Sequence, residues 1–533
     1  DVSGPDALER ICSELLCDDV IETAQILVPS DREQAKHIHE YIEVSPLAGV
    51  TDSVGETLLK RSLQLPEVSV LRCATATRYH VVGDFERSDL VRFARKQLAN
   101  EVVDQWSINQ PLQAPFADGV SAERIIETVP VTALDDEALL ALSSKRRLSL
   151  DLYEMRTIRD YYRESNREPT DLELEMLAQT WSEHCVHKTF KALVSYRELS
   201  PEGVLVEGSE RVVDSMIHTY LKGATDNCGK DFVRSAFVDN AGIVRFDAEF
   251  DLAIKAETHN HPSALEPFGG ANTGVGGVVR DILGVSARPI ANTDVLCFGP
   301  QDKSDSPAGV LHPARIKEGV IAGVEDYGNK MGIPTVNGAI LFEEGYTANP
   351  LVFVGCIGIL PSGAHPTEPR PGDRVVVLGG RTGRDGLRGA TFSSMEMDHS
   401  TGDIAGTAVQ IGHPIHEKQA QEVVCAARDE RLYHAITDCG AGGLSSSVGE
   451  MAEKLGADVY LERIPLKYPG LQPWEIWLSE AQERMVMAVP ESNLKRLLEI
   501  CDIHETEASI IGEFRDDGIL RVTYENDLVG AFD

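Results

Sequence analysis

The chain has 533 residues, 42% hydrophobic and 25% charged, an ordinary composition for a globular protein of about three or four domains. Its formal net charge of −35 argues against a duplex nucleic-acid binder, which needs basic surface to displace counterions. No apolar run of about 18 residues is present, and we expect neither a transmembrane helix nor a signal peptide. The 10 cysteines lack a Cys-x-x-Cys pair and suit reduced thiols in a cytoplasmic protein.

The front of the chain contains an internal repeat. Residues 7–26 resemble residues 89–108, and each segment predicts a helix, a turn with Asn or Asp, and a strand. A hairpin-like run of β-branched residues precedes the second copy, so that residues 38–108 predict a β-α-β-β-α-β unit. The first copy would retain only its last helix and strand. Because the first residue is Asp1, we expect a truncated or processed start. The alternative to a true repeat is a chance similarity between two amphipathic helices.

A linker with helices is predicted next. Residues 109–150 mix a Pro-rich loop with a helical stretch. Thr170 and Glu173 match a capping box at a helix start. One apolar face of this helix would carry residues spaced at i, i+3 and i+7, namely Leu174, Leu177 and Trp181.

The helix runs into TWSEHCVHKTF, residues 180–190, which holds two histidines and a cysteine. His184 follows Trp181 on the apolar side, so a buried structural histidine is one interpretation. Cys185 and His187 are also plausible zinc ligands, although no second ligand pair accompanies them.

Strands alternate with helices from about residue 205 to 362, and the densest polar block lies here, at residues 255–281. Its start alternates as a strand, so that Lys255 and Glu257 share one face. Ligands bind at strand ends in open α/β sheets, and four polar residues follow this strand. They are Thr258, His259, Asn260 and His261.

Five glycines between residues 269 and 277 predict a loop that a ligand can approach closely. A helix beginning near Val278 would direct its free N–H groups at an anion. Arg280 and Asp281 are then expected in its first turn, where arginine suits phosphate and aspartate suits Mg²⁺.

A further α/β domain begins with PGDRVVVL, residues 371–378, a turn followed by a buried strand. It holds three more motifs: QIGHP at 410–414, TDCGAGGLSSSVGEMA at 437–452, and LSEAQERM at 478–485. The middle motif taken alone is also compatible with a plain strand–turn–helix. The Gly- and Arg-rich residues 380–394 suit either an anion loop or a hairpin.

These motifs together resemble the phosphoribosylformylglycinamidine synthase family. The ETHNHP, GVVRD and SEHC stretches carry the resemblance, which covers almost all of residues 150–533. The front repeat resembles the family's small accessory subunit, fused and duplicated. The full synthase has two homologous halves, and this chain ends where the first half ends in such enzymes.

The resemblance implies roles for individual residues. His184 and His259 would be catalytic, with His259 as the proton acceptor. The substrate would be bound by Thr258, Asn260, His261, Arg280, Gln410, Glu480 and Gln482. Lys255 and His187 would bind ATP, and Mg²⁺ would be bound by Glu257, Asp281 and Asp438. Three positions depart from the family pattern: His187 replaces a tyrosine of the small form, His413 an aspartate, and Ala481 a serine.

The predicted fold class is α/β, with an aminoimidazole-ribonucleotide-synthase-like ATP-binding domain, a C-terminal α/β domain and a ferredoxin-like front region. The predicted regions are 1–30, a remnant of the first small-subunit-like repeat; 31–112, the second repeat; 113–204, a linker and helical region; 205–362, the ATP-binding-type domain; and 363–533, the C-terminal domain of the first half.

The implied reaction converts formylglycinamide ribonucleotide, ATP and ammonia into formylglycinamidine ribonucleotide, ADP and phosphate. The expected partners are a glutaminase that releases the ammonia and the second synthetase half. Two alternatives stay open: a sibling ATP enzyme of the same fold, and a non-catalytic module that docks a glutaminase. The adjacent HNHP and SEHC motifs argue against the sibling enzymes.

Overall fold

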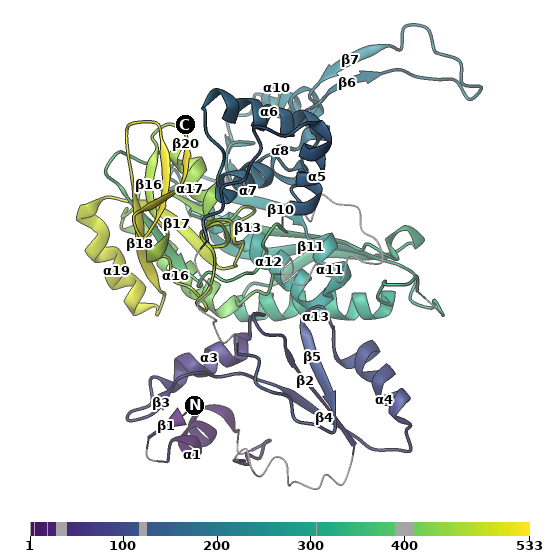
Figure 1. Ribbon diagram of the computed structural model, residues 1–533, viewed down its shortest axis with the longest axis vertical. Coiled ribbons are helices and arrows are strands. Elements are labelled where there is room, and N and C mark those ends of the chain that lie inside the picture. Colours follow the sequence, from purple (N-terminus) through teal and green to yellow (C-terminus); the bar gives the residue numbers. More distant parts are fainter. Residues whose placement is uncertain are drawn as a thin grey trace. The chain divides into compact units, whose positions relative to one another are not determined.

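The computed structural model describes residues 2–4, 6–18, 20–27, 40–116, 125–304, 306–389 and 410–533. The chain forms two compact units, Asp1–Gly119 and Val120–Asp533 (Figure 1). All ten cysteines are free thiols. Among the helices of the described residues, none has the length and apolar character needed to cross a membrane.

Within the first unit, residues 38–108 have the predicted β-α-β-β-α-β order. The elements of the unit are β1 (Val2–Ser3), α1 (Ala7–Ile11), β2 (Glu40–Pro46), α3 (Ser53–Ser62), β3 (Ser69–Val70), β4 (Thr77–Val81), α4 (Arg87–Phe93) and β5 (Asp104–Ile108). An antiparallel sheet joins β4, β2 and β5 in that order, while β3 pairs with β1 instead. The order of elements over residues 38–108 is confirmed, and a four-stranded ferredoxin-like sheet stays a prediction.

The two repeat copies share their helix and turn. Both helices continue into a π-helical turn, at Cys12–Leu16 and at Ala94–Leu98. After it, Asp18 and Asn100 each accept the backbone N–H two residues on, at 2.9 and 3.2 Å. The copies then differ, because β5 pairs with β2 whereas residues 22–27 form no strand. The prediction was therefore right for the helix and turn and wrong for the first copy's strand.

The second unit begins with helices. They are α5 (Asp136–Arg146), α6 (Leu152–Glu164), α7 (Asp171–Thr180), α8 (Glu183–Val186) and α9 (Lys188–Lys191). The predicted capping box is confirmed, since the Thr170 hydroxyl accepts the Glu173 N–H at 3.1 Å and the Glu173 carboxylate accepts the Thr170 N–H at 3.0 Å. The predicted apolar face is confirmed too: Leu174 is buried, and Leu177 and Trp181 pack against the same cluster.

A hairpin and a six-stranded sheet follow. The hairpin is β6 (Leu193–Tyr196) with β7 (Arg211–Asp214), followed by α10 (Gly223–Cys228). The sheet has the order β12-β11-β13-β10-β9-β8. Its strands are β8 (Val233–Ser235), β9 (Gly242–Arg245), β10 (Phe250–Thr258), β11 (Arg288–Phe298), β12 (Thr335–Phe342) and β13 (Leu351–Pro361). Packed with it are α11 (Asn260–Leu265), α12 (Pro267–Gly284) and α13 (Pro313–Met331).

The glycine-rich segment forms a helix rather than the predicted loop. α12 begins at Pro267, capped by the Glu266 carboxylate, and not near Val278. Its glycines allow neighbours to approach closely: a Cβ on Gly270 would lie 2.5 Å from the Ser263 nitrogen, and one on Gly276 would lie 2.6 Å from the Tyr327 hydroxyl. Close helix packing therefore explains these glycines, and the predicted anion loop is wrong.

The chain ends in a seven-stranded sheet of order β15-β17-β14-β18-β16-β19-β20. The strands are β14 (Arg374–Gly379), β15 (Ala435–Asp438), β16 (Ala457–Tyr460), β17 (Arg484–Val489), β18 (Ala508–Phe514), β19 (Leu520–Tyr524) and β20 (Asp527–Phe532). The helices are α16 (Pro414–Asp429), α17 (Leu444–Ala452), α18 (Pro473–Leu478) and α19 (Leu494–Ile503). β14 is the buried strand predicted at residues 371–378.

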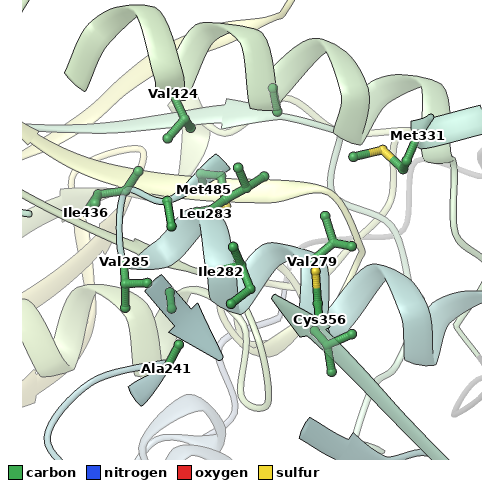
Figure 2. Packing of buried hydrophobic residues seen from close by; sticks show 14 of the residues in the cluster. Ala241, Val279, Ile282, Leu283, Val285, Met331, Cys356, Val424, Ile436 and Met485 are labelled. Atoms are coloured by element: carbon green, nitrogen blue, oxygen red, sulfur yellow. The ribbon is translucent and has the colours of Figure 1, made fainter. Parts of the chain in front are cut away.

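One hydrophobic core connects the two large sheets. Ile282 and Leu283 of α12 are fully buried in a cluster that also contains Cys356 of β13, Val424 of α16 and Met485 of β17. Figure 2 shows these side chains converging around α12. Since α12 packs against both sheets, its polar residues are held at a fixed place between them.

Candidate active site

The end of β10 places a lysine between two carboxylates. Lys255 Nζ lies 3.7 Å from Glu257 Oε2 and 3.3 Å from Asp281 Oδ2 of α12. The predicted shared face of Lys255 and Glu257 is thus confirmed, and it is the face toward α12. Lys255 is three-quarters buried, and the surrounding carboxylates raise its pKa although its desolvation opposes them, so the ammonium stays charged.

Asp438, at the end of β15, joins this cluster. Burial raises the pKa of Asp281, the charge of Asp438 raises it further, and Lys255 opposes both effects. Burial likewise raises the pKa of Asp438, while Arg280 and Lys255 lower it. The Asp438 side chain is only 11% exposed, with Oδ2 3.9 Å from Arg280 Nε. The three carboxylates predicted to bind metal are therefore gathered at one place.

The chemical type of these donors fits Mg²⁺, although the oxygens of the three residues do not all lie within 4.8 Å of one another. Carboxylate oxygens are the protein ligands that this hard cation prefers. Burial is the main cause of the raised pKa values of Asp281 and Asp438, and repulsion from Asp438 adds to it at Asp281. A divalent cation at Glu257, Asp281 and Asp438 would remove that repulsion.

Two histidines adjoin the carboxylates. The ring Nδ1 of His259 is hydrogen-bonded to the Gly270 carbonyl, and since a carbonyl only accepts, this nitrogen carries the proton. Nε2 is then the acceptor nitrogen of a neutral ring, and burial lowers the His259 pKa to about 4. His184 of α8 stays exposed to solvent, yet desolvation by the surrounding protein lowers its pKa while Glu257 raises it. His184 therefore lies near Glu257 of the candidate site and not in an apolar core.

The turn after β10 is bound to β13. The Asn260 side-chain oxygen accepts the Val352 N–H at 2.8 Å, and the His259 N–H donates to the Val352 carbonyl at 2.9 Å. Thr258 is exposed and donates its N–H to Glu257 Oε1 at 3.0 Å, while His261 lies in α11. His187 has a left-handed φ of 58° between α8 and α9 and is exposed. The substrate and ATP roles of these residues stay predictions.

Arg280 differs from its predicted setting. It lies deep in α12 rather than in a first turn, and its side chain is only 4% exposed. Its guanidinium donates to Glu417 Oε2 of α16 at 3.1 Å and to Gln482. The Tyr327 hydroxyl contacts Glu417 and lies 3.1 Å from Glu483 Oε1. The guanidinium is therefore held inside the protein, and phosphate binding by Arg280 stays a prediction.

The three predicted substrate residues of the C-terminal domain meet next to Arg280. Gln410 Nε2 donates to Glu480 Oε2 at 2.7 Å, and the Gly442 N–H donates to Glu480 Oε1 at 3.1 Å. Gln482 Nε2 donates to the Glu480 carbonyl at 2.7 Å. Ala481 between them is fully buried, where the resembled family has a serine. The three motifs of this domain are thus brought together.

Residues 380–389 form no hairpin, and the anion loop stays a prediction. Each of their arginines binds a carboxylate within the second unit. The pairs are Arg381 with Glu507, Arg384 with Glu475, and Arg388 with Glu175. Residues 390–394 lie outside the described residues.

Sequence reasoning missed several residues of the cluster. Asn240, between β8 and β9, donates its amide to Asp438. Glu417 accepts from Arg280, and Tyr327 donates to Glu417; neither residue belongs to a recognised motif. His413 was noted in the QIGHP motif, but its stacking on His416, with ring centroids 3.8 Å apart near the start of α16, was not predicted. Spacing alone gives no signal for the contacts of Asn240 and Glu417, because they join segments far apart in the chain.

Three segments match known family descriptions. Residues 139–188 match the formylglycinamide ribonucleotide amidotransferase linker domain. Residues 238–360 match the N-terminal domain of AIR synthase related protein, and residues 370–525 match its C-terminal domain. These matches confirm the predicted α/β fold class for the second unit.

Similar proteins cover most of the second unit. The phosphoribosylformylglycinamidine synthase subunit PurL of Thermoplasma acidophilum is 38% identical over 405 residues, which are 75% of this chain and 50% of that protein. Thermotoga maritima PurL complexed with FGAR superposes with a TM-score of 0.57 at 34% identity, covering 71% of this chain and 55% of that one. The complex with ATP gives a TM-score of 0.54 at 33% identity, covering 71% and 54%.

The chain spans about half the length of the curated relatives it matches. The described site lies within the matched stretch, and the three family segments occur in the order that the sequence motifs predicted. The predicted resemblance is therefore confirmed: over that stretch, the chain is a homologue of phosphoribosylformylglycinamidine synthase subunit PurL.

Proposed function

We propose that this chain supplies the first half of a phosphoribosylformylglycinamidine synthase, an ATP-dependent ligase of purine biosynthesis. One observation carries the proposal: a single cluster joins Lys255, the carboxylates of Glu257, Asp281 and Asp438, and a neutral histidine, in a homologue of PurL. The PurL of Thermotoga maritima has been solved with FGAR and with ATP, which supports these as the substrates.

The reaction must activate an amide, whose resonance makes its carbon a poor electrophile. Transfer of the γ-phosphoryl group of ATP to the amide oxygen releases ADP and creates a leaving group. Ammonia then attacks the carbon, phosphate departs with the oxygen, and the incoming nitrogen loses protons. His259 Nε2 has the free lone pair to accept one of them, and we assign His184 to proton transfer as well.

Charge stabilisation is the second requirement of phosphoryl transfer. The Lys255 ammonium is proposed to contact the ATP phosphates. Glu257, Asp281 and Asp438 are the residues that would hold Mg²⁺, which neutralises charge on the transferring group when bound. The ribonucleotide would be bound by Gln410, Glu480 and Gln482. Arg280 donates a hydrogen bond to Gln482.

Two macromolecular partners belong to the proposal. One face of the six-stranded sheet exposes Ile254 of β10, Leu341 of β12 and Phe353 of β13, at 52%, 52% and 38%. An apolar face of this kind is typical of an interface, and we propose the second synthetase half as its occupant. A glutaminase would supply ammonia, in keeping with the solved PurLQS assembly of Thermotoga maritima. Residues 205–362 and 363–533 would be the two domains of the half.

The test measures ADP release with formylglycinamide ribonucleotide, ATP and excess ammonium, for this chain alone and mixed with the complementary half. We expect negligible turnover alone and strong turnover in the mixture. Glu257→Gln should lower it by about 10²–10⁴-fold, while Glu430→Gln, which removes an exposed partner of Arg496, should leave it unchanged. A mixture that binds the glutaminase but releases no ADP would contradict the proposal and favour a docking module.

A further inference from the structure

Asp438 is held by a side chain that no motif includes. Asn240 Nδ2 donates to Asp438 Oδ1 at 2.7 Å across a sequence separation of 198 residues. Asp438 ends a strand of the seven-stranded sheet, whereas Asn240 lies in the turn before β9 of the other sheet. The contact therefore joins the two domains of the second unit at a carboxylate of the candidate site.

Neighbouring groups fix the orientation of the Asn240 amide. The Thr437 hydroxyl is 3.3 Å from Asn240 Oδ1 and donates to it. A reversed amide would turn its oxygen toward the Asp438 carboxylate, two acceptors in contact, so the donor must face Asp438. The backbone is fixed as well, because the Asn240 N–H donates to Asp239 Oδ1 at 2.8 Å, and Asp239 Oδ2 lies 2.8 Å from His365 Nε2.

Gly284, the last residue of α12, leaves the space that the Asn240 amide fills. A Cβ at Gly284 would lie 2.3 Å from Asn240 Nδ2 and 3.1 Å from its Cγ. The nearest atoms to that Cβ are all in the Asn240 side chain, which is flexible and would move away. An alanine at position 284 would thus displace the amide without altering Asn240 itself.

We propose that Asn240 is a positioning residue that fixes the Asp438 carboxylate so that Oδ2 is presented to a divalent cation. The inference rests on the proposed function, in which Asp438 binds Mg²⁺. A hydrogen bond to one carboxylate oxygen stops the group from rotating and leaves the other oxygen in one place. Outer partners of this kind typically change metal affinity by about 10–100-fold when removed.

The test follows Mn²⁺ binding to the whole chain by electron paramagnetic resonance, in which only the unbound ion gives the sharp signal. Asn240→Leu keeps the side-chain shape and removes the donor, and Gly284→Ala displaces the amide. Both should weaken Mn²⁺ binding about tenfold or more. The control is Asn493→Leu, which removes a similar half-buried amide that donates to the Leu432 carbonyl at 3.1 Å. It should bind Mn²⁺ as the unmodified chain does.

Thermal melting of each variant distinguishes a lost contact from a lost fold. If Asn240→Leu does not fold, the Gly284→Ala variant tests the inference, since it retains Asn240. Folded Asn240→Leu or Gly284→Ala protein that binds Mn²⁺ within about twofold of the unmodified chain would overturn the inference. An unmodified chain that binds no Mn²⁺ would instead contradict the metal assignment in the proposed function, and the Asn240 inference would fall with it.

Discussion

Arg280 and Asp281 are neighbours on α12, yet they belong to two charged clusters of different kinds. Asp281 faces Lys255 and Glu257 at the end of β10, where Glu257 is half exposed. Arg280 points into the protein, where Glu417 is 1% exposed. The outer cluster has more carboxylates than cations and suits a metal and phosphates. The inner cluster is enclosed by protein and joins helices of both domains, so we infer that it holds the outer one in place.

The largest expected effect is a loss of activity on substitution in the outer cluster. Replacing Glu257 by Gln or His259 by Asn removes a proposed ligand or proton acceptor and should lower ADP release by the assembled halves by about 10²–10⁴-fold. Because Glu257 is half exposed, its substitution should leave the urea midpoint unchanged. Substitutions that abolish activity only by unfolding the chain would contradict this separation.

Substitutions in the inner cluster should lower the stability of the folded chain. At a pH of about 9, where Glu417 is ionised, Glu417→Ala leaves the buried Arg280 guanidinium without its main partner and should reduce the free energy of unfolding by about 3–5 kcal/mol. The measurement is urea denaturation of the whole chain. Tyr327→Phe, which removes only the hydroxyl, should cost about 1–3 kcal/mol. A Glu417→Ala variant as stable as the unmodified chain would show that the inner cluster does not hold the domains.

Two adjacent glycines of α12 test whether close packing explains the glycine-rich stretch. A Cβ on Gly276 would lie 2.6 Å from the Tyr327 hydroxyl, whereas one on Gly277 meets nothing within 4 Å. Gly276→Ala should destabilise the chain by about 1–3 kcal/mol through overpacking. Gly277→Ala should stabilise it by about 0.5–1 kcal/mol, since alanine favours a helix. Equal effects of both changes on the urea midpoint would refute the packing explanation.

Stability should also depend on pH. Burial raises the pKa of Glu417 from 4.5 to about 8, so that the folded chain holds a proton that the unfolded chain releases. This contribution to stability is fully present below pH 4.5 and is lost as the pH rises through 8. His259, with its pKa lowered from 6.5 to about 4, acts oppositely below pH 6.5, so the loss should be visible from pH 6.5 to 8.

The check is a series of urea titrations across that pH range. Glu417→Gln should flatten the slope, because glutamine neither binds nor releases the proton. A slope that is unchanged in Glu417→Gln would assign the titration to another group, of which Asp281 is the next candidate.

Local patterns were sufficient to predict the capped helix at Thr170, the strand over residues 251–257 and, as one of two alternatives, the strand–turn–helix at residues 437–452. The motifs also identified the carboxylates that the structure gathers. The glycine-rich stretch misled the prediction, because a glycine needed for close helix packing looks the same in sequence as one needed in a loop. Partners such as Asn240 and Glu417 were not predictable, since only the fold brings them beside Asp438 and Arg280.

The central claim is that α12 and β15 bring Asp281 and Asp438 together to bind a divalent cation. Anomalous scattering from crystals of the chain grown with MnCl₂ and ADP tests it directly. We predict a manganese peak within about 2.5 Å of carboxylate oxygens of both residues. Manganese bound only elsewhere, or no peak between Asp281 and Asp438 in crystals that contain bound ADP, would contradict the account.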